Sequence, residues 1–374
     1  MASILLSGLV SCGGKTTSEE DNALGKRIEL KYADQFSIEE MDDGSAFIRI
    51  EDGLNYLVLP EGMDIPHWAK NSKEKFTTIY RPLDSIYLAA SSAFDLFLKI
   101  GAEGFVTMTS TKASDWGIPE VKELVESGDV VYVGKYSEPN YEAILESECD
   151  LAIESTMIYH SPNTKESLES LGVPVMVERS SYEAEPLGRL EWIKLYGLLL
   201  DKEDEANLFF DSMAEKYEKI VAETDKKVAE DRPEVAFFSI SSNNYATVRK
   251  PGDYISKMIY VAGGRYSMEE LPVDDDNALS TTNIQLESFF DYVVDSDYLI
   301  YNTAIQGEIK TKAELIDKFG ELEKTKAVKD GNIWATRKSL FQKSSGLADM
   351  TEELYLIISG QGEGKALEYF VKLE

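Results

Sequence analysis

The stretch PNYEAILESECDLAIEST, residues 139–156, joins two patterns that decide the fold. Its first half, residues 139–146, has the apolar spacing of an amphipathic helix and begins with a proline and an asparagine, which favour helix starts. Its second half contains the apolar run 151–153, which predicts a buried strand over 151–154. A helix that leads directly into a buried strand is typical of a βαβ unit, so this stretch favours an α/β fold.

The same alternation continues on both sides of this stretch. On the N-terminal side and just beyond it, strands are predicted at 85–89, 104–108, 130–133 and 173–177, and helices at 94–100, 119–126 and 164–171. After Pro233, strands are predicted at 235–240, 298–301 and 333–336, and helices near 254–261, 286–294 and 348–358. Both series are typical of mostly parallel sheets that are covered by helices.

Two helical stretches without an intervening strand, 187–200 and 202–231, separate these series. At about 1.5 Å per residue the second helix would be some 45 Å long, enough to connect two lobes. A chain of 374 residues is also too long for one comfortable hydrophobic core. We therefore expect an α/β protein with two Rossmann-like lobes joined by a long rigid helix.

The N-terminal region predicts a short β-hairpin extension. The runs Ala46–Ile50 and Tyr56–Leu59 flank Asp52-Gly53, a turn signal. Residues 13–27 are polar, without apolar periodicity, and read as a flexible tether. The expected organisation is a signal remnant (1–12), this tether (13–27), an N-terminal lobe (28–186), linker helices (187–231) and a C-terminal lobe (232–374).

Cys12 is one of only two cysteines and follows a short apolar run in LVSCGG, residues 9–14. The order Leu9-Val10-Ser11-Cys12 matches the bacterial lipobox, in which the cysteine becomes the lipid-bearing first residue after cleavage. A stray thiol near the terminus is the alternative. The other cysteine, Cys149, precedes a buried strand and is expected to be a small core residue.

The composition excludes several functional classes. The net charge of -30 opposes binding to nucleic acid or to an anionic bilayer; it favours solubility or attraction to a cationic partner. The apolar run 4–10 is shorter than the ~20 residues that a membrane-spanning helix needs. Signatures of serine hydrolases, zinc proteases and dithiol enzymes are missing from the sequence, so we do not expect an enzyme.

The helix-strand stretch has a weak echo later in the chain. In 141–156 and in 286–303, a glutamate opens a helix, an aspartate follows eight or ten residues later, and an apolar strand ends near a threonine. Equivalent units in two lobes would explain the echo. Generic likeness of helix-strand units is the alternative.

Residues 80–374 resemble the substrate-binding proteins of ABC importers for iron-siderophore complexes, haem and cobalamin. The resemblance rests on the order and spacing of five stretches: PNYE (139–142), CDLAI (149–153), LGVPV (171–175), PLGRLEWI (186–193) and AGG (262–264). In that family one glutamate on each lobe docks to arginines of the permease. The matching residues are Glu142 and Glu287, which alternatively only favour their own helix N-termini.

Ligand contacts are expected from loops at strand ends that face the cleft between the lobes. In the first lobe the candidates are Ser91, Ser92, Lys112, Trp116, Lys135, Tyr136, Tyr159 and His160. In the second lobe they are Asn243, Asn244, Tyr245, Arg249, and the loop from Arg337 to Gln342. Basic groups in so acidic a chain suit an anionic chelate, although each could be a solvated surface cation. His160 beside Tyr159 could instead ligate haem iron, or be a plain surface residue.

The resemblance implies a lipid-anchored receptor outside the cytoplasmic membrane that binds a siderophore-like iron complex and delivers it to an ABC permease with its ATPase. We expect a monomer with no resident cofactor or metal site, held at the membrane only by its lipid. A haem or cobalamin receptor is the first alternative. Two others belong to different classes: a surface-anchored hydrolase on a similar scaffold, and an adhesive domain without a cleft ligand.

Overall fold

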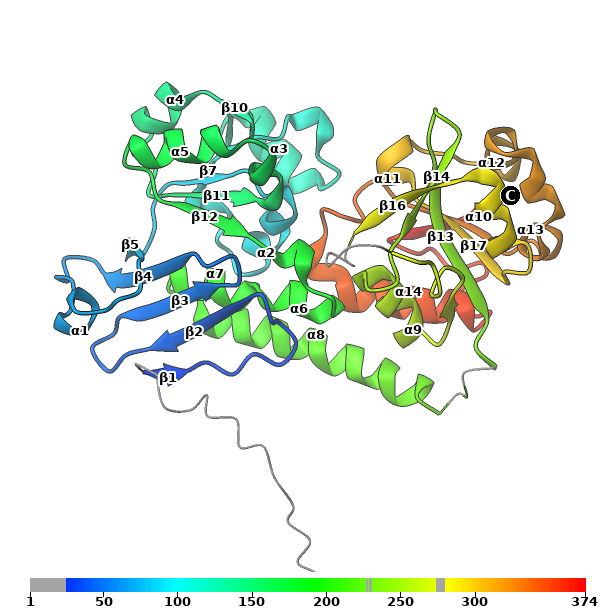
Figure 1. Cartoon of the computed structure of the whole chain (residues 1–374), viewed down its shortest axis with the longest axis horizontal. Helices are drawn as coiled ribbons and strands as arrows, with labels where there is room; N and C mark the ends of the chain where they lie inside the picture. The colour runs from blue at the N-terminus through cyan, green and yellow to red at the C-terminus, as the bar shows by residue number, and fades with distance from the viewer. Residues whose placement is uncertain (1–24, 227, 229–230, 274–279) are drawn as a thin grey trace, which may run out of the picture.

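The computed structural model describes residues 25–226, 228, 231–273 and 280–374. Two α/β lobes lie side by side, and a long helix runs beneath both (Figure 1). This arrangement confirms the predicted fold class. The signal remnant with Cys12 and most of the tether lie outside the described residues. Within the described residues no helix is long and apolar enough to cross a membrane.

The N-terminal lobe contains a five-stranded parallel sheet in the order β12-β11-β6-β7-β8. Its strands are β6 (Ile86–Leu88), β7 (Val106–Thr109), β8 (Val131–Tyr132), β11 (Leu151–Ser155) and β12 (Val175–Glu178). Its helices are α2 (Phe94–Lys99), α3 (Pro119–Ser127), α4 (Tyr141–Glu146) and α5 (Pro162–Ser170), and a small ribbon is formed by β9 (Gly134–Lys135) and β10 (Glu138–Pro139). Ile144 of α4 and Leu168 of α5 pack on one face of the sheet, which confirms the alternation that the sequence predicts.

Three helices link the lobes: α6 (Pro186–Glu191), α7 (Ile193–Leu199) and α8 (Glu203–Thr224). The prediction that the last helix extends to residue 231 is wrong. It ends at Thr224, whose hydroxyl donates to the carbonyl of Val261 at 2.8 Å, while Arg232 binds the Thr224 carbonyl at 3.2 Å. The helix of 22 residues is therefore about 33 Å long. It still packs against α7 on one side and against α9 and α14 of the second lobe on the other.

The C-terminal lobe has a seven-stranded sheet in the order β16-β14-β13-β17-β18-β19, with β15 beside β13. Its strands are β13 (Glu234–Ile240), β14 (Tyr245–Arg249), β15 (Arg265–Tyr266), β16 (Thr281–Gln285), β17 (Tyr298–Tyr301), β18 (Ile333–Thr336) and β19 (Phe370–Lys372). Its helices are α9 (Tyr254–Val261), α10 (Leu286–Val293), α11 (Thr303–Gln306), α12 (Lys312–Lys318), α13 (Lys326–Asp330) and α14 (Leu347–Ile358). The predicted strands β13, β17 and β18 run parallel, whereas β14, β16 and β19 pair antiparallel and were not predicted.

The N-terminal extension is larger than the predicted hairpin. The hairpin forms β3 (Ala46–Ile50) and β4 (Asn55–Pro60), within a five-stranded sheet in the order β1-β2-β3-β4-β5. The additional elements are β1 (Lys26–Arg27), β2 (Phe36–Glu40), β5 (Thr77–Arg81) and α1 (His67–Lys70). Thus the last two residues of the predicted tether are part of a strand. One face of this sheet joins the main core through Phe36, whose ring lies 4.8 Å from that of Trp192.

Two buried carboxylates attach this sheet to the linker. Glu191 of α6 accepts the backbone N–H groups of residues 31–33 at 2.7–2.9 Å. Glu183, just before α6, accepts those of residues 34 and 35 at 2.9 and 3.1 Å. Five consecutive backbone donors are therefore satisfied by two side chains, and Glu183 also receives the indole N–H of Trp192 at 2.9 Å. Because backbone donors left without an acceptor are costly, this contact fixes the extension on the linker helices.

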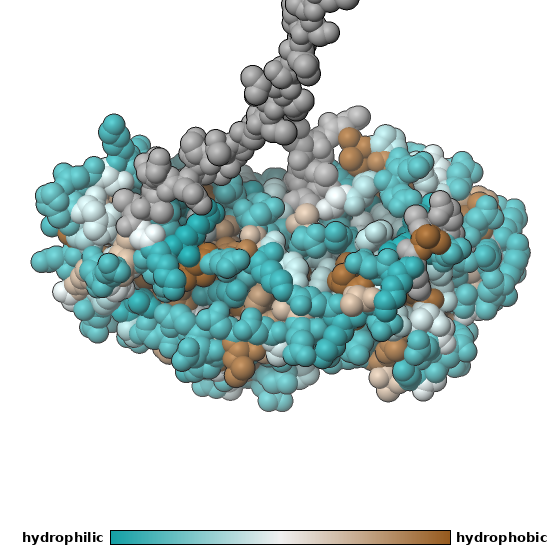
Figure 2. Space-filling model, turned by 90° about the horizontal axis from the view of Figure 1, so that it is seen from below, coloured by the Kyte–Doolittle hydropathy of each residue, from teal (hydrophilic) through white to brown (hydrophobic). Residues whose placement is uncertain are grey.

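The view from below shows a surface on which hydrophilic residues predominate and hydrophobic residues form scattered patches (Figure 2). Ion pairs contribute to it along α8, where Lys216 contacts Asp349 and Glu352 of α14. Such a surface is expected for a chain with a net charge of -30.

Candidate functional site

The loops at the carboxyl ends of the parallel strands carry several predicted ligand residues. Ser91 and Ser92 form a short 3-10 turn after β6 and are partly exposed. Lys112 follows β7 and is exposed, with its Nζ 5.9 Å from the centre of the Tyr132 ring. Lys135 is exposed in β9. The N-terminal lobe therefore presents hydroxyl and ammonium groups at one edge of its sheet.

Two aromatic candidates in this lobe belong to the core instead. The side chain of Trp116 is only 4% exposed, lies edge-on to Phe94 at 5.5 Å and donates its indole N–H to the carbonyl of Thr111. Tyr136 is half-buried against the cluster that contains Tyr87 and Val133. Packing of these rings, rather than ligand contact, explains their positions in this structure.

Tyr159 and His160 lie in a 3-10 turn after β11, and both are exposed. The Tyr159 hydroxyl donates to Asp52 of the β3–β4 turn at 2.5 Å and accepts from Arg179 at 3.3 Å. Partial burial, together with the bond to Asp52, raises the pKa of Tyr159 to about 12. The neutral phenol is therefore the favoured form of Tyr159 in this structure.

The second-lobe arginines are engaged within their own lobe. Arg249 is buried, binds Asp253 at 3.3 Å and lies over the ring of Phe341 at 4.6 Å. Arg337 donates to the carbonyl of Leu367. The polar hairpin tip with Asn243, Asn244 and Tyr245 is exposed, and Asn244 has a left-handed φ of 60°. In this lobe the hairpin tip and Arg337 are thus exposed, whereas Arg249 is not.

Gln342 connects the two lobes instead of lining an open surface. Its Oε1 accepts the backbone N–H of Gly117 at 2.6 Å, and its Nε2 donates to the carbonyl of Asp115 at 3.0 Å. Nearby, Nζ of Lys338 donates to the carbonyl of Ser114 at 3.2 Å. We call this contact between residues 114–117 and 338–342 the clasp. It joins the loop after β7 to the loop after β18.

The sequence prediction missed a buried polar pair below the strand ends. Glu154 of β11 is fully buried, and neither carboxylate oxygen has a partner among the described residues. Burial raises its pKa to about 8. Tyr87 of β6 points to the same face, since it pairs with Ala152, and its hydroxyl is also buried without a partner there. The glutamate that interrupts the apolar run Leu151-Ala152-Ile153 was the available sequence signal.

The two predicted docking glutamates occupy equivalent places. Glu142 lies in the first turn of α4, and Glu287 in the first turn of α10. Both side chains are exposed. Each could either meet a partner surface or favour its own helix N-terminus, and the geometry is compatible with both roles.

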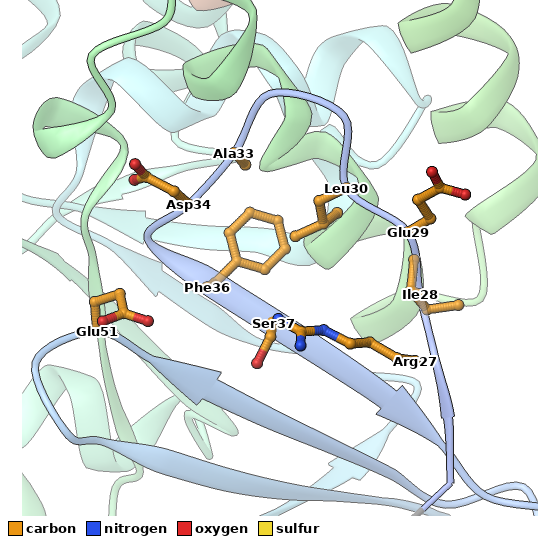
Figure 3. A pocket seen from close by; sticks show the side chains of 9 residues that line it. All are labelled: Arg27, Ile28, Glu29, Leu30, Ala33, Asp34, Phe36, Ser37 and Glu51. Atoms are coloured by element: carbon orange, nitrogen blue, oxygen red, sulfur yellow. The ribbon is translucent and has the colours of Figure 1, made fainter. Parts of the chain in front are cut away.

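The hollow shown in Figure 3 lies elsewhere, on the N-terminal extension. This pocket of about 470 Å³ is framed by the segment 27–34, by β2 and by Glu51, with Phe36 and Leu30 at its apolar side (Figure 3). None of the predicted ligand residues lines it. Over the described residues, no group of three or more histidine, cysteine or acidic side chains is arranged to hold a metal ion.

Comparison with known proteins identifies the family that shares this architecture. A model of the family described as periplasmic binding protein matches residues 87–340. The chain belongs to this family. The resemblance inferred from the sequence is thus confirmed, and because the family consists of substrate-binding proteins, so is the expectation of a binding protein rather than an enzyme.

An uncharacterised lipoprotein of Methanocaldococcus jannaschii is 23% identical over 308 residues, which cover 78% of this chain and 68% of the relative. A periplasmic haem-binding protein of Pseudomonas aeruginosa is 16% identical with a TM-score of 0.60, covering 78% of this chain and 98% of its own. The petrobactin-binding protein of Bacillus subtilis is 13% identical with a TM-score of 0.58, and the match covers 77% of this chain and 94% of the petrobactin-binding protein. The family match begins at residue 87, so the N-terminal sheet of this binding protein precedes it.

Proposed function

We propose that this binding protein carries a siderophore-like ferric complex in the cleft between its lobes and delivers it to an ABC permease. The observation that carries the proposal is the set of exposed cations and hydroxyls at one sheet edge. Lys112 and Lys135 are accessible there in a chain of net charge -30, and Ser91 and Ser92 lie after the neighbouring strand. Exposed ammonium groups suit the carboxylate or catecholate oxygens of an anionic chelate.

Haem and cobalamin are the alternative ligands within the same class. A tyrosinate at Tyr159 would favour haem, but its hydroxyl donates to the carboxylate of Asp52, which favours the protonated phenol, whereas the bond from Arg179 acts in the opposite direction. His160 remains exposed as a candidate for haem iron. We prefer a siderophore complex as the ligand because its binding needs only the charged and hydroxyl groups that the loops present.

Titration distinguishes these ligands. The full-length protein is incubated with a ferric catecholate siderophore, haem or cobalamin, and binding is followed by visible absorption and native mass spectrometry. We expect one ferric siderophore per chain and about tenfold weaker binding for Lys112→Glu, whereas Lys122→Glu on α3 serves as a charge-matched control. Stoichiometric binding of haem or cobalamin alone would overturn the siderophore assignment, and turnover of any ligand would favour an enzyme.

We further propose that Cys12 carries the lipid that holds the receptor outside the cytoplasmic membrane, near its permease. A diacylglycerol plus an N-acyl chain would contribute about 0.8 kcal/mol per buried methylene, ample for stable anchoring. A Cys12→Ser variant should be released into the soluble fraction. If the variant stays with the membrane after fractionation, Cys12 is not the anchor.

A further inference from the structure

The clasp brings the backbones of the two lobes unusually close. A Cβ added to Gly117 would lie 2.9 Å from Cα of Ser339, 3.0 Å from its Cβ and 3.1 Å from Oε1 of Gln342. All three atoms belong to the C-terminal lobe, and the Cα and Cβ atoms of Ser339 cannot move away by a change of side-chain rotamer. A side chain at position 117 would therefore push the lobes apart by a few tenths of an ångström or strain the loop.

Further contacts beside the clasp also hold the two lobes together. The buried carboxylate of Asp95 in α2 accepts the backbone N–H of Ser345 at 2.8 Å, directly beyond the clasp loop of the second lobe. On the linker side, Lys257 of α9 binds Glu185 at 3.1 Å. The lobes are thus held at two separate places, and a change at the clasp alters their spacing on the side of the strand ends.

The clasp lies at the border of the proposed ligand cleft. One of its loops follows β7, and Lys112 lies two residues before the clasp. The other loop follows β18, and Arg337 lies directly before the clasp. Both strands end at the edge where open α/β sheets present their sites. The distance between the loops at the clasp consequently sets the distance between the cleft walls above it.

We propose that Gly117 is a specificity-determining residue, which fixes the width of the cleft by allowing the two backbones to touch. The proposal rests on the proposed function, since it assumes that the cleft binds a chelate. A narrow, fixed cleft favours a compact ferric complex whose atoms touch both lobes. The long helix α8, which packs against α7 and against α9 and α14, leaves little freedom for a later hinge motion to restore those contacts.

The test separates spacing from selectivity. Spacing is measured without ligand in crystal structures of the variants, as the distance between the Cα atoms of Lys122 in the first lobe and Glu321 in the second, all in a Cys12→Ser background. Selectivity is measured as the ratio of affinities for a ferric catecholate siderophore and for haem. Gly117→Ala is compared with Gly104→Ala, a matched control in the same lobe whose added Cβ meets no atom within 4 Å.

We expect Gly117→Ala to lengthen this distance by a few tenths of an ångström and to lower the affinity ratio about tenfold, while Gly104→Ala changes neither. A second variant, Gln342→Ala, removes both hydrogen bonds without adding a side chain at position 117; it should raise the atomic displacements of both clasp loops and lower the ratio less. An unchanged distance, or a changed distance with an unchanged ratio, would overturn the proposal. If the unmodified protein binds neither probe, the proposed function fails first, and the distance measurement still shows whether the clasp sets the spacing.

Discussion

The helix-strand units α4–β11 and α10–β17 occupy equivalent places in the two lobes and use the same local chemistry. Before β11, the carboxylate of Asp150 accepts the backbone N–H groups of residues 84 and 85 at 2.8 and 2.9 Å. Before β17, Asp297 accepts the N–H of Glu234 at 2.8 Å. In both cases the acceptor binds the start of the neighbouring parallel strand. The weak sequence echo therefore marks a shared way of joining adjacent strands.

The units differ at the position four residues after each aspartate. Glu154 and Tyr301 occupy this position, and both have buried oxygens without a partner among the described residues. In the C-terminal lobe the orphan is a phenol, whose neutral form tolerates burial. In the N-terminal lobe it is a carboxyl group, which burial keeps protonated near neutral pH. The comparison teaches that the lobes share their framework but not their response to pH.

Replacement of the carboxyl group should have the largest effect. Because the folded-state pKa of Glu154 is raised to about 8, the unfolded chain releases this proton at lower pH than the folded chain. Its contribution to stability is full below the unfolded-state pKa and is lost as pH rises toward 8. The free energy of unfolding of Glu154→Gln, taken relative to that of wild type, should rise by on the order of 3 kcal/mol between pH 4 and pH 8. Urea unfolding at several pH values measures this difference.

Tyr301→Phe is the control for that series, at the equivalent position of the other lobe. The phenol does not ionise between pH 4 and pH 8, and its raised pKa moves it further from that window. The difference in unfolding free energy between this variant and wild type should stay constant with pH. If the difference in unfolding free energy between Glu154→Gln and wild type is also independent of pH, the carboxyl group has a partner in solution.

The two docking candidates offer the next largest effect. Glu142→Lys and Glu287→Lys should each lower uptake of the chelate by about tenfold, equivalent to about 1.4 kcal/mol, with unchanged ligand affinity. Transport in cells and ligand titration of the purified protein are measured together. If uptake is unchanged in one variant, that glutamate only stabilises its own helix N-terminus. The two lobes would then differ in how they contact the permease.

Removal of the strand-joining aspartates should cost less. Asp150→Ala leaves two backbone N–H groups without their acceptor, whereas Asp297→Ala leaves one and also frees Lys326. Since water can replace an acceptor at these partly open sites, we expect a loss of about 1 kcal/mol for Asp150 and somewhat less for Asp297. Equal losses, measured by urea unfolding, would mean that the number of bonds does not matter.

The smallest expected effect is that of Tyr301→Phe on stability itself. Deleting an unpartnered hydroxyl removes no hydrogen bond among the described residues. The free energy of unfolding should therefore change by a few tenths of a kcal/mol at most. A loss above about 1 kcal/mol would indicate a buried water or other partner for this phenol.

Local patterns allowed the prediction of the parallel strands and most helices, because apolar periodicity depends only on nearby residues. The end of α8 was missed since it depends on Val261 and Arg232, which lie far along the chain from its start. The N-terminal sheet was underestimated for a similar reason. Its strands β2 and β5 are short, and pairing with β3 and β4 gives them their partners.

The candidate site shows the same division. Strand-end loops could be located from the sequence, so Ser91, Ser92 and Lys112 lie where expected. Which side chains those loops expose depends on tertiary packing. Trp116 therefore lies in the core, and Gln342 bonds to the opposite lobe instead of standing free. A contact such as that of Gly117 with Ser339 leaves no local signal at all.

The attachment of residues 31–35 to Glu183 and Glu191 has a consequence for shortened forms of this protein. A fragment that began at the family match would retain both carboxylates but lose the five backbone N–H groups that donate to them. Glu191 would keep its contact with Lys194 at 2.7 Å, and Glu183 would keep the indole N–H of Trp192. Because the lost hydrogen bonds contribute to stability, the N-terminal sheet and the linker form one structural unit, and such a fragment should unfold more easily than the full-length chain.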